Sequence, residues 1–295
     1  MKTRTDNKRI RHGRVRLIVQ ACFAALSNGY IKGFAHGKIF EGKTKFLCVP
    51  GLNCYSCPGA LASCPIGSLQ ATLNAREYRI SLYAAGFLVV FGTLLGRFVC
   101  GFLCPFGLIQ DVLFKIPFIK KIRRLPCEKA LRLLRFAILA VFVILLPLFI
   151  TDITGLGAPW FCTFICPVGT LEGGIPLVLL NKAMRGAAGF LFKWKLLILI
   201  LTLFSSIILY RPFCRYICPL GALYGMFNSI SFCRFTIDGK KCTSCGACQR
   251  ICKLDIPVWK KPNSIDCIRC GDCKAHCPHG AIRQDFFASV PKPSC

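Results

Sequence analysis

Composition and cysteine placement predict an α-helical membrane domain of about four transmembrane helices, followed by a small cysteine-rich α+β domain. Of the 295 residues, 54% are hydrophobic and 17% are charged, whereas soluble domains carry about 25% charged residues. The chain also contains 22 cysteines. These figures exclude intrinsic disorder, a small secreted disulfide scaffold and a simple soluble enzyme. They leave a membrane protein whose thiols bind metal, with room for one membrane domain and one appended domain.

Four apolar stretches are interpreted as membrane-spanning helices. They cover residues 17–35, 80–99, 136–150 and 196–210. A helix needs about 20 residues to cross a hydrocarbon core about 30 Å thick, and the last two stretches reach that length with their apolar flanks. Asn28 and Lys32 interrupt the first stretch. No small-residue cleavage site follows it, so we expect an uncleaved anchor rather than a cleaved signal peptide.

The positive charge predicts the orientation of the chain. There are 39 Lys and Arg against 12 Asp and Glu, a formal net charge of +27. The basic residues gather between the apolar stretches, with seven in 1–16 and eight in 98–135, while 37–80 and 151–192 are poorer. This pattern is typical of cytoplasmic segments of membrane proteins, and it disfavours a nucleic-acid partner. We expect a multi-pass protein of the cytoplasmic membrane, surrounded by lipid, with both termini in the cytoplasm.

The C-terminal tail carries two runs of the form Cys-x2-Cys-x2-Cys-x3-Cys. The first run is Cys242, Cys245, Cys248 and Cys252, and the second is Cys267, Cys270, Cys273 and Cys277. This is the spacing of bacterial two-cluster ferredoxins, in which the fourth Cys of each run binds the other cluster. It predicts one [4Fe-4S] cluster on Cys242, Cys245, Cys248 and Cys277, and a second on Cys252, Cys267, Cys270 and Cys273.

The two runs divide the chain into a transmembrane domain, 1–232, and a ferredoxin-type domain, 233–295. Gly246 and Gly271 should let the backbone turn closely around sulfur. Structural zinc usually takes two ligand pairs separated by a longer spacer, so the spacing disfavours zinc. The first run ends in Cys252-Lys253 and lacks the usual proline.

A second motif, Cys-Pro-apolar-Gly, recurs four times in the apolar part. The copies begin at Cys64, Cys104, Cys166 and Cys218, and the last three have a Cys four residues upstream, at Cys100, Cys162 and Cys214. The first copy instead has Cys57 seven residues upstream, with Cys54 and Cys48 further back. Proline suits the first position of a helix, and a helix N-terminus favours an anionic thiolate cluster. Two Cys-x3-Cys-Pro units would supply four thiols, enough for one cluster.

Membrane topology limits which units can pair, because the two faces lie about 30 Å apart. The ends of the apolar stretches predict an inner membrane cluster on Cys100, Cys104, Cys214 and Cys218, and an outer one on Cys57, Cys64, Cys162 and Cys166. Three alternatives stay open. Cys54 could replace Cys57 as a ligand. Cys48 and Cys54 could form a disulfide in an oxidising compartment. The units could also split their ligands between clusters, as ferredoxin runs do.

Taken together, the motifs resemble a known family. The segments that carry the resemblance are GLNCYSCPGALASCPIG, CGFLCPFGLIQD, RPFCRYICPLGALYG and CTSCGACQRIC…CIRCGDCKAHCP. They are similar to the membrane polyferredoxins, a group with NapH-, NosR- and CcoG-like members, and most similar to the short NapH-like form. The resemblance covers residues 45–285 and the first apolar stretch. It implies electron transfer through [4Fe-4S] centres between a cytoplasmic donor or quinol pool and an extracytoplasmic redox partner, such as a flavin or haem protein, with a quinone as a further cofactor.

Catalytic patterns are missing from the sequence: we find no nucleotide-binding glycine loop, no recognisable nucleophile–base pair and no haem attachment site. We therefore expect an electron-transfer subunit without substrate chemistry of its own, although the sequence leaves an enzymatic role open. A factor that senses redox state or helps to mature a metalloenzyme is the alternative, which the CcoG-like members favour. A cation transporter fits poorly, because the four apolar stretches contain no acidic residue.

Overall fold

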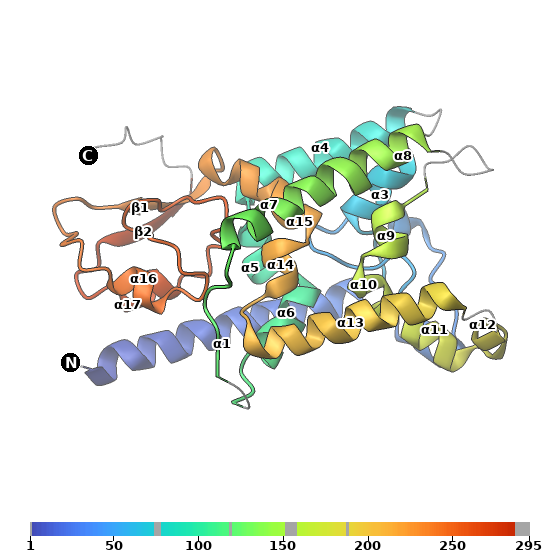
Figure 1. Ribbon diagram of the computed structural model, residues 1–295, viewed down its shortest axis with the longest axis horizontal. Helices are drawn as coiled ribbons and strands as arrows, with labels where there is room; N and C mark the ends of the chain where they lie inside the picture. The colour runs from blue at the N-terminus through green and yellow to red at the C-terminus, as the bar shows by residue number, and fades with distance from the viewer. Residues whose placement is uncertain (1, 74–77, 118–119, 151–157, 187–188, 287–295) are drawn as a thin grey trace.

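The computed structural model describes residues 2–73, 78–117, 120–150, 158–186 and 189–286. It consists of an elongated helical body with a small sheet-containing tail at one end (Figure 1). The N-terminus lies at the same end as the tail, whereas the α11 and α12 helices lie at the opposite end. The two ends of the described chain are therefore on one side of the body.

The last three apolar stretches lie in long helices of the body, whereas the first, expected as one helix over 17–35, is divided between the end of α1 and the short helix α2 (Ile31–His36) by a break at residues 28–30. The long helices are α1 (Lys2–Ser27), α4 (Tyr78–Leu95), α7 (Glu128–Ile138) continued by η2 (Leu139–Leu145) and α8 (Leu146–Phe149), and α13 (Phe190–Ile208). Within the described residues, two helices are long and apolar enough to cross a membrane, Glu128–Phe149 and Phe190–Ile208. A shorter apolar segment, Leu82–Leu95, lies in α4.

Shorter helices connect and cap the long ones. They are α2 (Ile31–His36), η1 (Lys43–Phe46), α3 (Pro65–Thr72), α5 (Phe98–Phe102), α6 (Pro105–Leu113), α9 (Trp160–Phe164), α10 (Pro167–Gly169), η3 (Thr170–Gly174), α11 (Ile175–Leu180), α12 (Lys182–Gly186), α14 (Pro212–Tyr216), α15 (Pro219–Met226) and η4 (Phe227–Ser229). The π-helical segments η2 and η3 each end two residues before a proline, Pro147 and Pro176 respectively. Proline has no N–H to donate to the carbonyl four residues earlier, which favours such local widening.

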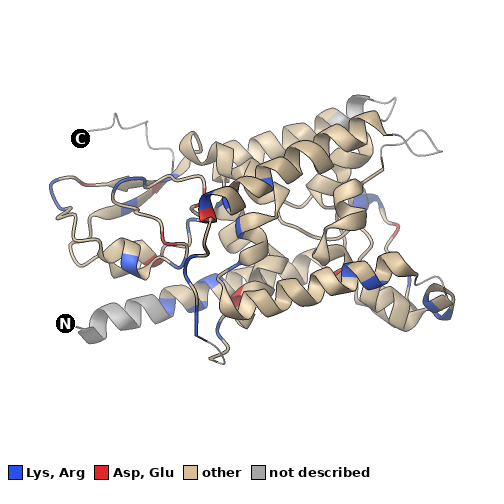
Figure 2. Cartoon of the chain, viewed as in Figure 1, with Lys and Arg blue, Asp and Glu red and all other residues tan. Residues whose placement is uncertain are grey.

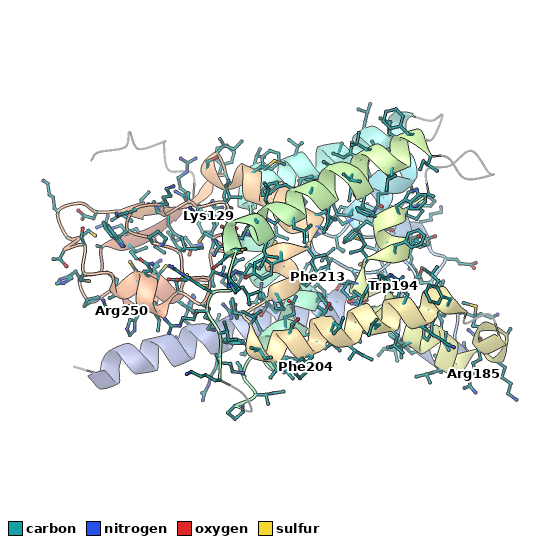
Figure 3. All side chains as sticks on the ribbon, viewed as in Figure 1. Lys129, Arg185, Trp194, Phe204, Phe213 and Arg250 are labelled. Atoms are coloured by element: carbon teal, nitrogen blue, oxygen red, sulfur yellow. The ribbon has the colours of Figure 1, made fainter. Side chains whose placement is uncertain are left out.

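The body exposes apolar side chains and buries charged ones. On α13, Leu197, Leu201 and Phe204 are each about half exposed or more, and Phe204 points away from the body (Figure 3). Phe213, by contrast, is 1% exposed inside the body, beside the almost fully buried Arg211. Large exposed apolar patches mark protein or membrane contact surfaces, so this distribution favours an apolar environment around α13.

The tail combines a two-stranded sheet with two short helices. Strand β1 (Cys233–Ile237) pairs antiparallel with β2 (Ile282–Phe286), with Cys233 opposite Phe286. Helices α16 (Ala247–Ile251) and α17 (Asp272–His276) pack against each other. The residues before these helices, Gly246 and Gly271, have φ angles of 68° and 79°. The predicted glycine turns in the two cysteine runs are thus confirmed, because these left-handed angles favour glycine.

Buried ion pairs dock the tail onto the body. Asp266 accepts from Arg135 Nη2 at 2.6 Å and also pairs with Arg132 and with Arg97. Arg97 and Arg135 are each 2% exposed, and this charged junction lies between the tail and the helical body (Figure 2). Burial raises the pKa of Asp266, but the three guanidinium groups outweigh it and hold the pKa below its ordinary value. The tail is therefore docked on the body through a buried, charged interface rather than joined to it by a loose linker.

Backbone contacts bring the tail directly onto α5. A Cβ atom on Gly101 would meet the carbonyl oxygen of Ile268. Nearby, the fully buried Asn228 donates to the carbonyls of Ser264 and Cys267, at 2.9 and 2.8 Å. The second cysteine run of the tail is consequently held against the part of the body that follows α4.

We expect Gly101→Ala to lower the thermal stability of the protein and to make the tail more sensitive to limited proteolysis. The added methyl group meets a backbone oxygen, which cannot move without displacing the tail. The matched control is Gly86→Ala on α4, where a Cβ atom meets nothing within 4 Å. That change should be neutral or stabilising, because Ala is favoured over Gly in a helix by about 0.5–1 kcal/mol. Equal behaviour of the two variants would contradict the close docking.

Candidate functional site

Four thiols from two separate parts of the chain meet in the body. Cys100 lies on α5, Cys104 precedes α6, Cys214 lies on α14 and Cys218 precedes α15. All four are buried, with exposed fractions of 6% or less. Cys104 lies close enough to Cys100 and Cys214 for their charges to interact, and Cys218 lies that close to each of the other three. These four cysteines, here called the inner set, are those that the sequence assigns to the inner membrane cluster.

Each Cys-Pro step begins a helix, as the sequence predicts. Cys64, Cys104, Cys166 and Cys218 have extended backbone angles, and the proline after each is the first helical residue. The backbone N–H of Gly221 donates to Cys218 Sγ at 3.4 Å. The free N–H groups of a helix start are oriented toward these sulfurs, which favours negative charge there.

A second group of thiols surrounds a cavity of about 580 Å³. Five cysteines line it: Cys48, Cys54, Cys64, Cys162 and Cys166. The last four lie close enough to one another for their charges to interact, and these four are here called the outer set. Lys45 and Lys195 also line the cavity. Two cationic side chains beside four thiols make the cavity suited to an anionic thiolate centre.

The structure differs from the sequence expectation at Cys57. Cys57 is 2% exposed, and its Sγ donates to Asn28 Oδ1 at 3.5 Å, beside the first helix. Cys54 instead lines the cavity, and its backbone N–H donates to Glu172 Oε2 at 2.8 Å. The geometry therefore favours the alternative in which Cys54 joins the other three cysteines. Both Cys54 and Cys48 carry free thiols, and Cys48 Sγ lies 3.7 Å from Ser68 Oγ.

One loop touches both sets. A Cβ atom on Gly51 would meet the backbone of Cys104 of the inner set, and the next two residues, Leu52 and Asn53, line the cavity of the outer set. Tyr224 is fully buried, donates its hydroxyl to the same loop, and is an electrostatic neighbour of thiols from both sets. The two sets are thus separated by a few residues rather than by the thickness of a bilayer.

The tail groups its cysteines as the ferredoxin spacing requires for one cluster. Cys252, Cys267, Cys270 and Cys273 line a small cavity and are electrostatic neighbours. Burial raises the pKa of Cys267 to about 11 and that of Cys270 to about 12. A bound cation deprotonates a coordinating thiol outright, so iron would reverse this preference. The other predicted tail group consists of Cys242, Cys245, Cys248 and Cys277. Cys248 lies near Cys242, and Cys245 is exposed. Cys277 Sγ accepts a hydrogen bond from Ala281 N at 3.4 Å.

The donor arrangement fits a cluster better than a single ion. In the part of the chain that the structure describes, no three Cys, His, Asp or Glu side chains converge as one bound metal ion would require. Tetrahedral zinc needs its ligands at about 2.0–2.3 Å from one point. The outer set and the Cys267 group line cavities instead, as ligands of a polynuclear centre do. All-thiolate ligation in sets of four is the donor chemistry of [4Fe-4S] clusters.

Sequence reasoning missed the polar residues that support the thiols. Asp111 pairs with Arg211, whose Nε and Nη2 donate at 2.8 and 2.5 Å, and with Arg16 Nη2 at 3.1 Å. All three are at most 5% exposed, and Arg211 also donates to the carbonyl of Cys100. The signal in the sequence was Asp111 itself, an acid seven residues after Cys104 in an otherwise apolar segment.

Comparison with known proteins supports this chemistry. A family model described as a 4Fe-4S binding domain matches residues 80–126, 135–180 and 194–235, which contain the last three Cys-Pro repeats. The protein is therefore of the iron–sulfur electron-transfer class. An uncharacterized protein of Methanocaldococcus jannaschii is 30% identical over 66% of this chain and 74% of its own length. No solved structure matches the chain.

Two named relatives identify the family. The ferredoxin-type protein NapH of Haemophilus influenzae is 29% identical over 66% of this chain and 64% of its own length. The putative electron transport protein YccM of Escherichia coli is 25% identical over 72% of this chain and 58% of its own length. The chain belongs to the NapH-like polyferredoxins, as the motifs predict. It spans less than two thirds of the length of these two relatives.

Proposed function

We propose that this protein relays electrons across a cell membrane through four [4Fe-4S] clusters, between a cytoplasmic donor or quinol pool and an extracytoplasmic redox partner such as a flavin or haem protein. The observation that carries the proposal is the convergence of thiols from distant helices into two sets of four, of which the inner set is buried. The inner set joins α5 and α6 to α14 and α15. Such convergence is costly in chain entropy unless a bound group rewards it.

Several features support a multi-pass membrane protein with both termini in the cytoplasm. The beginning of α1 and the tail lie at the same end of the long axis (Figure 1). The described basic residues of α1 and those of the segment before α7 lie toward that end, and a smaller basic group on α12 and at the start of α13 lies toward the opposite end (Figure 2). The apolar surface of α7–α8 and α13 lies beyond the tail end. This charge asymmetry favours the cytoplasm for the tail end. We assign the membrane domain to 1–232 and the ferredoxin domain to 233–295.

The order of the thiol sets supports a single relay. A [4Fe-4S] cluster, when bound, supplies a one-electron carrier. The chain holds the Cys267 group against α5 through Gly101, and Arg97 bridges the junction by donating to the carbonyls of Ile265 and Cys214. The 50–53 loop then lies between the inner and outer sets. The tail, the inner set and the outer set therefore follow one another along the molecule, and the proposed electron path has the same order.

Iron and sulfide analysis with EPR on anaerobically purified protein tests the proposal. We expect about sixteen irons per chain, the content of four cubane clusters. Cys218→Ser should remove about four of them and one EPR signal, because it deletes a ligand of the inner set. Cys22→Ser, at an exposed thiol on α1 outside both sets, is the control and should change nothing. About eight irons in the unmodified protein would confine the clusters to the tail and contradict the proposal.

A further inference from the structure

The four Cys-Pro repeats present an equivalent residue toward the thiol sets. Six residues after the Cys that begins each repeat stand Gln70, Gln110, Glu172 and Tyr224. Glu172 and Tyr224 contact the backbone of the loop that carries Cys54. The two glutamines contact sulfur directly, and both are fully buried. Each repeat thus directs two side chains toward the thiol sets or their supporting loop: its cysteine and the residue six positions later.

Each glutamine reaches across to the repeat with which its own cysteine is paired. Gln70 Nε2 donates to Cys162 Sγ at 3.4 Å, which joins the first repeat to the third. Gln110 Nε2 donates to Cys214 Sγ at 3.2 Å, which joins the second repeat to the fourth. In both cases the acceptor is the upstream Cys of the partner repeat. The pattern is the same in the outer and inner sets.

Local contacts fix the direction of both amides. Gln70 Nε2 also donates to the carbonyl of Ile66 at 3.2 Å, and its Oε1 accepts from Phe161 N at 3.0 Å. Gln110 Nε2 donates to the carbonyl of Phe106 at 3.4 Å. A carbonyl oxygen accepts and cannot donate, so the amide nitrogen must face it and therefore the neighbouring sulfur. The hydrogen bond to sulfur follows from this orientation.

A neutral donor beside a cluster sulfur changes the cluster's reduction potential. Reduction adds negative charge, and a hydrogen bond to a ligating sulfur stabilises the more negative state. The effect is strong in a buried site, where the local dielectric constant is low. The glutamine adds no net charge and needs no counterion. Its removal should therefore lower the potential without removing a ligand.

We propose that Gln70 and Gln110 are positioning residues that orient Cys162 and Cys214 and raise the reduction potentials of the outer and inner clusters, each acting on its own cluster. This inference rests on the proposed function, because it assumes that both thiol sets hold clusters.

The test uses Gln70→Met and Gln110→Met in the full-length protein, because Met keeps the length of the side chain and lacks an N–H donor. Each membrane cluster is first assigned as the EPR signal lost in Cys166→Ser or Cys218→Ser. In EPR-monitored redox titrations, Gln110→Met should lower the midpoint potential of the inner cluster only, and Gln70→Met that of the outer cluster only. Iron content should stay at the unmodified level. Gln20→Met is the control and should shift neither potential, because the described residues provide no partner for the buried Gln20 amide.

The outcomes separate this inference from the proposed function. Full iron with unchanged potentials in both Met variants would overturn the role of the glutamines and leave the relay intact. Absence of both membrane signals from the unmodified protein would overturn the relay itself. Should a Met variant lose iron, the neutral Gln→Leu change at the same position is measured, because Leu also lacks an N–H donor and adds no charge. A cluster retained in the Leu variant with a lowered potential supports the inference, and iron loss in both variants overturns a role in setting the potential.

Discussion

Cys54→Ser is expected to remove about four irons per chain together with the EPR signal of the outer cluster, the loss of one cubane, whereas Cys57→Ser should retain both. Cys54 lines the cavity with Cys64, Cys162 and Cys166. Cys57 instead directs its sulfur to Asn28. The measurement is iron and sulfide content with EPR of the two variants, purified anaerobically in parallel.

The pair is well matched, because the two cysteines lie three residues apart in one turn, where Cys57 N donates to the carbonyl of Cys54 at 3.1 Å. A general disturbance of the turn would affect both variants alike. Iron loss in the Cys57 variant with retention in the Cys54 variant would restore the ligand set expected from the sequence. Retention in both variants would exclude this turn as a source of ligands.

Asp111→Ala is expected to destabilise the folded protein by about 3–5 kcal/mol, the usual cost of removing one partner from a buried ion pair. The change leaves the guanidinium groups of Arg211 and Arg16 buried without their carboxylate. Arg211 also holds the carbonyl of Cys100, so the inner set should loosen as well. The measurements are the thermal unfolding midpoint in detergent and the yield of protein that retains iron.

A matched change at an exposed ion pair calibrates this result. Lys241 is half exposed, and its Nζ lies 3.9 Å from Asp238 Oδ2. Lys241→Ala should change stability by about 0–1 kcal/mol, the range measured for surface pairs. An Asp111→Ala protein as stable as the Lys241→Ala protein would show that the buried pair contributes little beyond an exposed one.

Local sequence determined the chemistry of this protein. Cysteine runs of fixed spacing predicted a ferredoxin-like tail, and the family model matches the Cys-Pro repeats of the body. The Cys-Pro steps predicted four helix starts, all of which are confirmed, because the ring of proline fixes φ and suits the first helical position. Gly246 and Gly271 predicted two turns that the φ angles confirm. The assignment of each cysteine to a cluster stays a prediction until iron is measured.

The lengths of the apolar stretches predicted less of the structure than the cysteine motifs did. Two of the four apolar stretches form helices of spanning length and composition within the described residues. The sequence also suggested that inner and outer thiols lie a bilayer apart. The 50–53 loop lies against Cys104 of the inner set and lines the cavity of the outer set, because irregular backbone can enter the body where protein buries it.

Tertiary structure alone decided which side chains face each other across the body. Spacing favoured Cys57, seven residues before Cys64, over Cys54, and only the contacts to Glu172 and Asn28 favour Cys54 instead. The reach of Gln110 to Cys214, 104 residues away, likewise has no local signal. Local geometry depends on neighbours in the chain, so the sequence by itself determined helix starts, turns and ligand chemistry. Contacts between distant segments depend on how whole helices pack, so only the folded body determined the partners of each thiol.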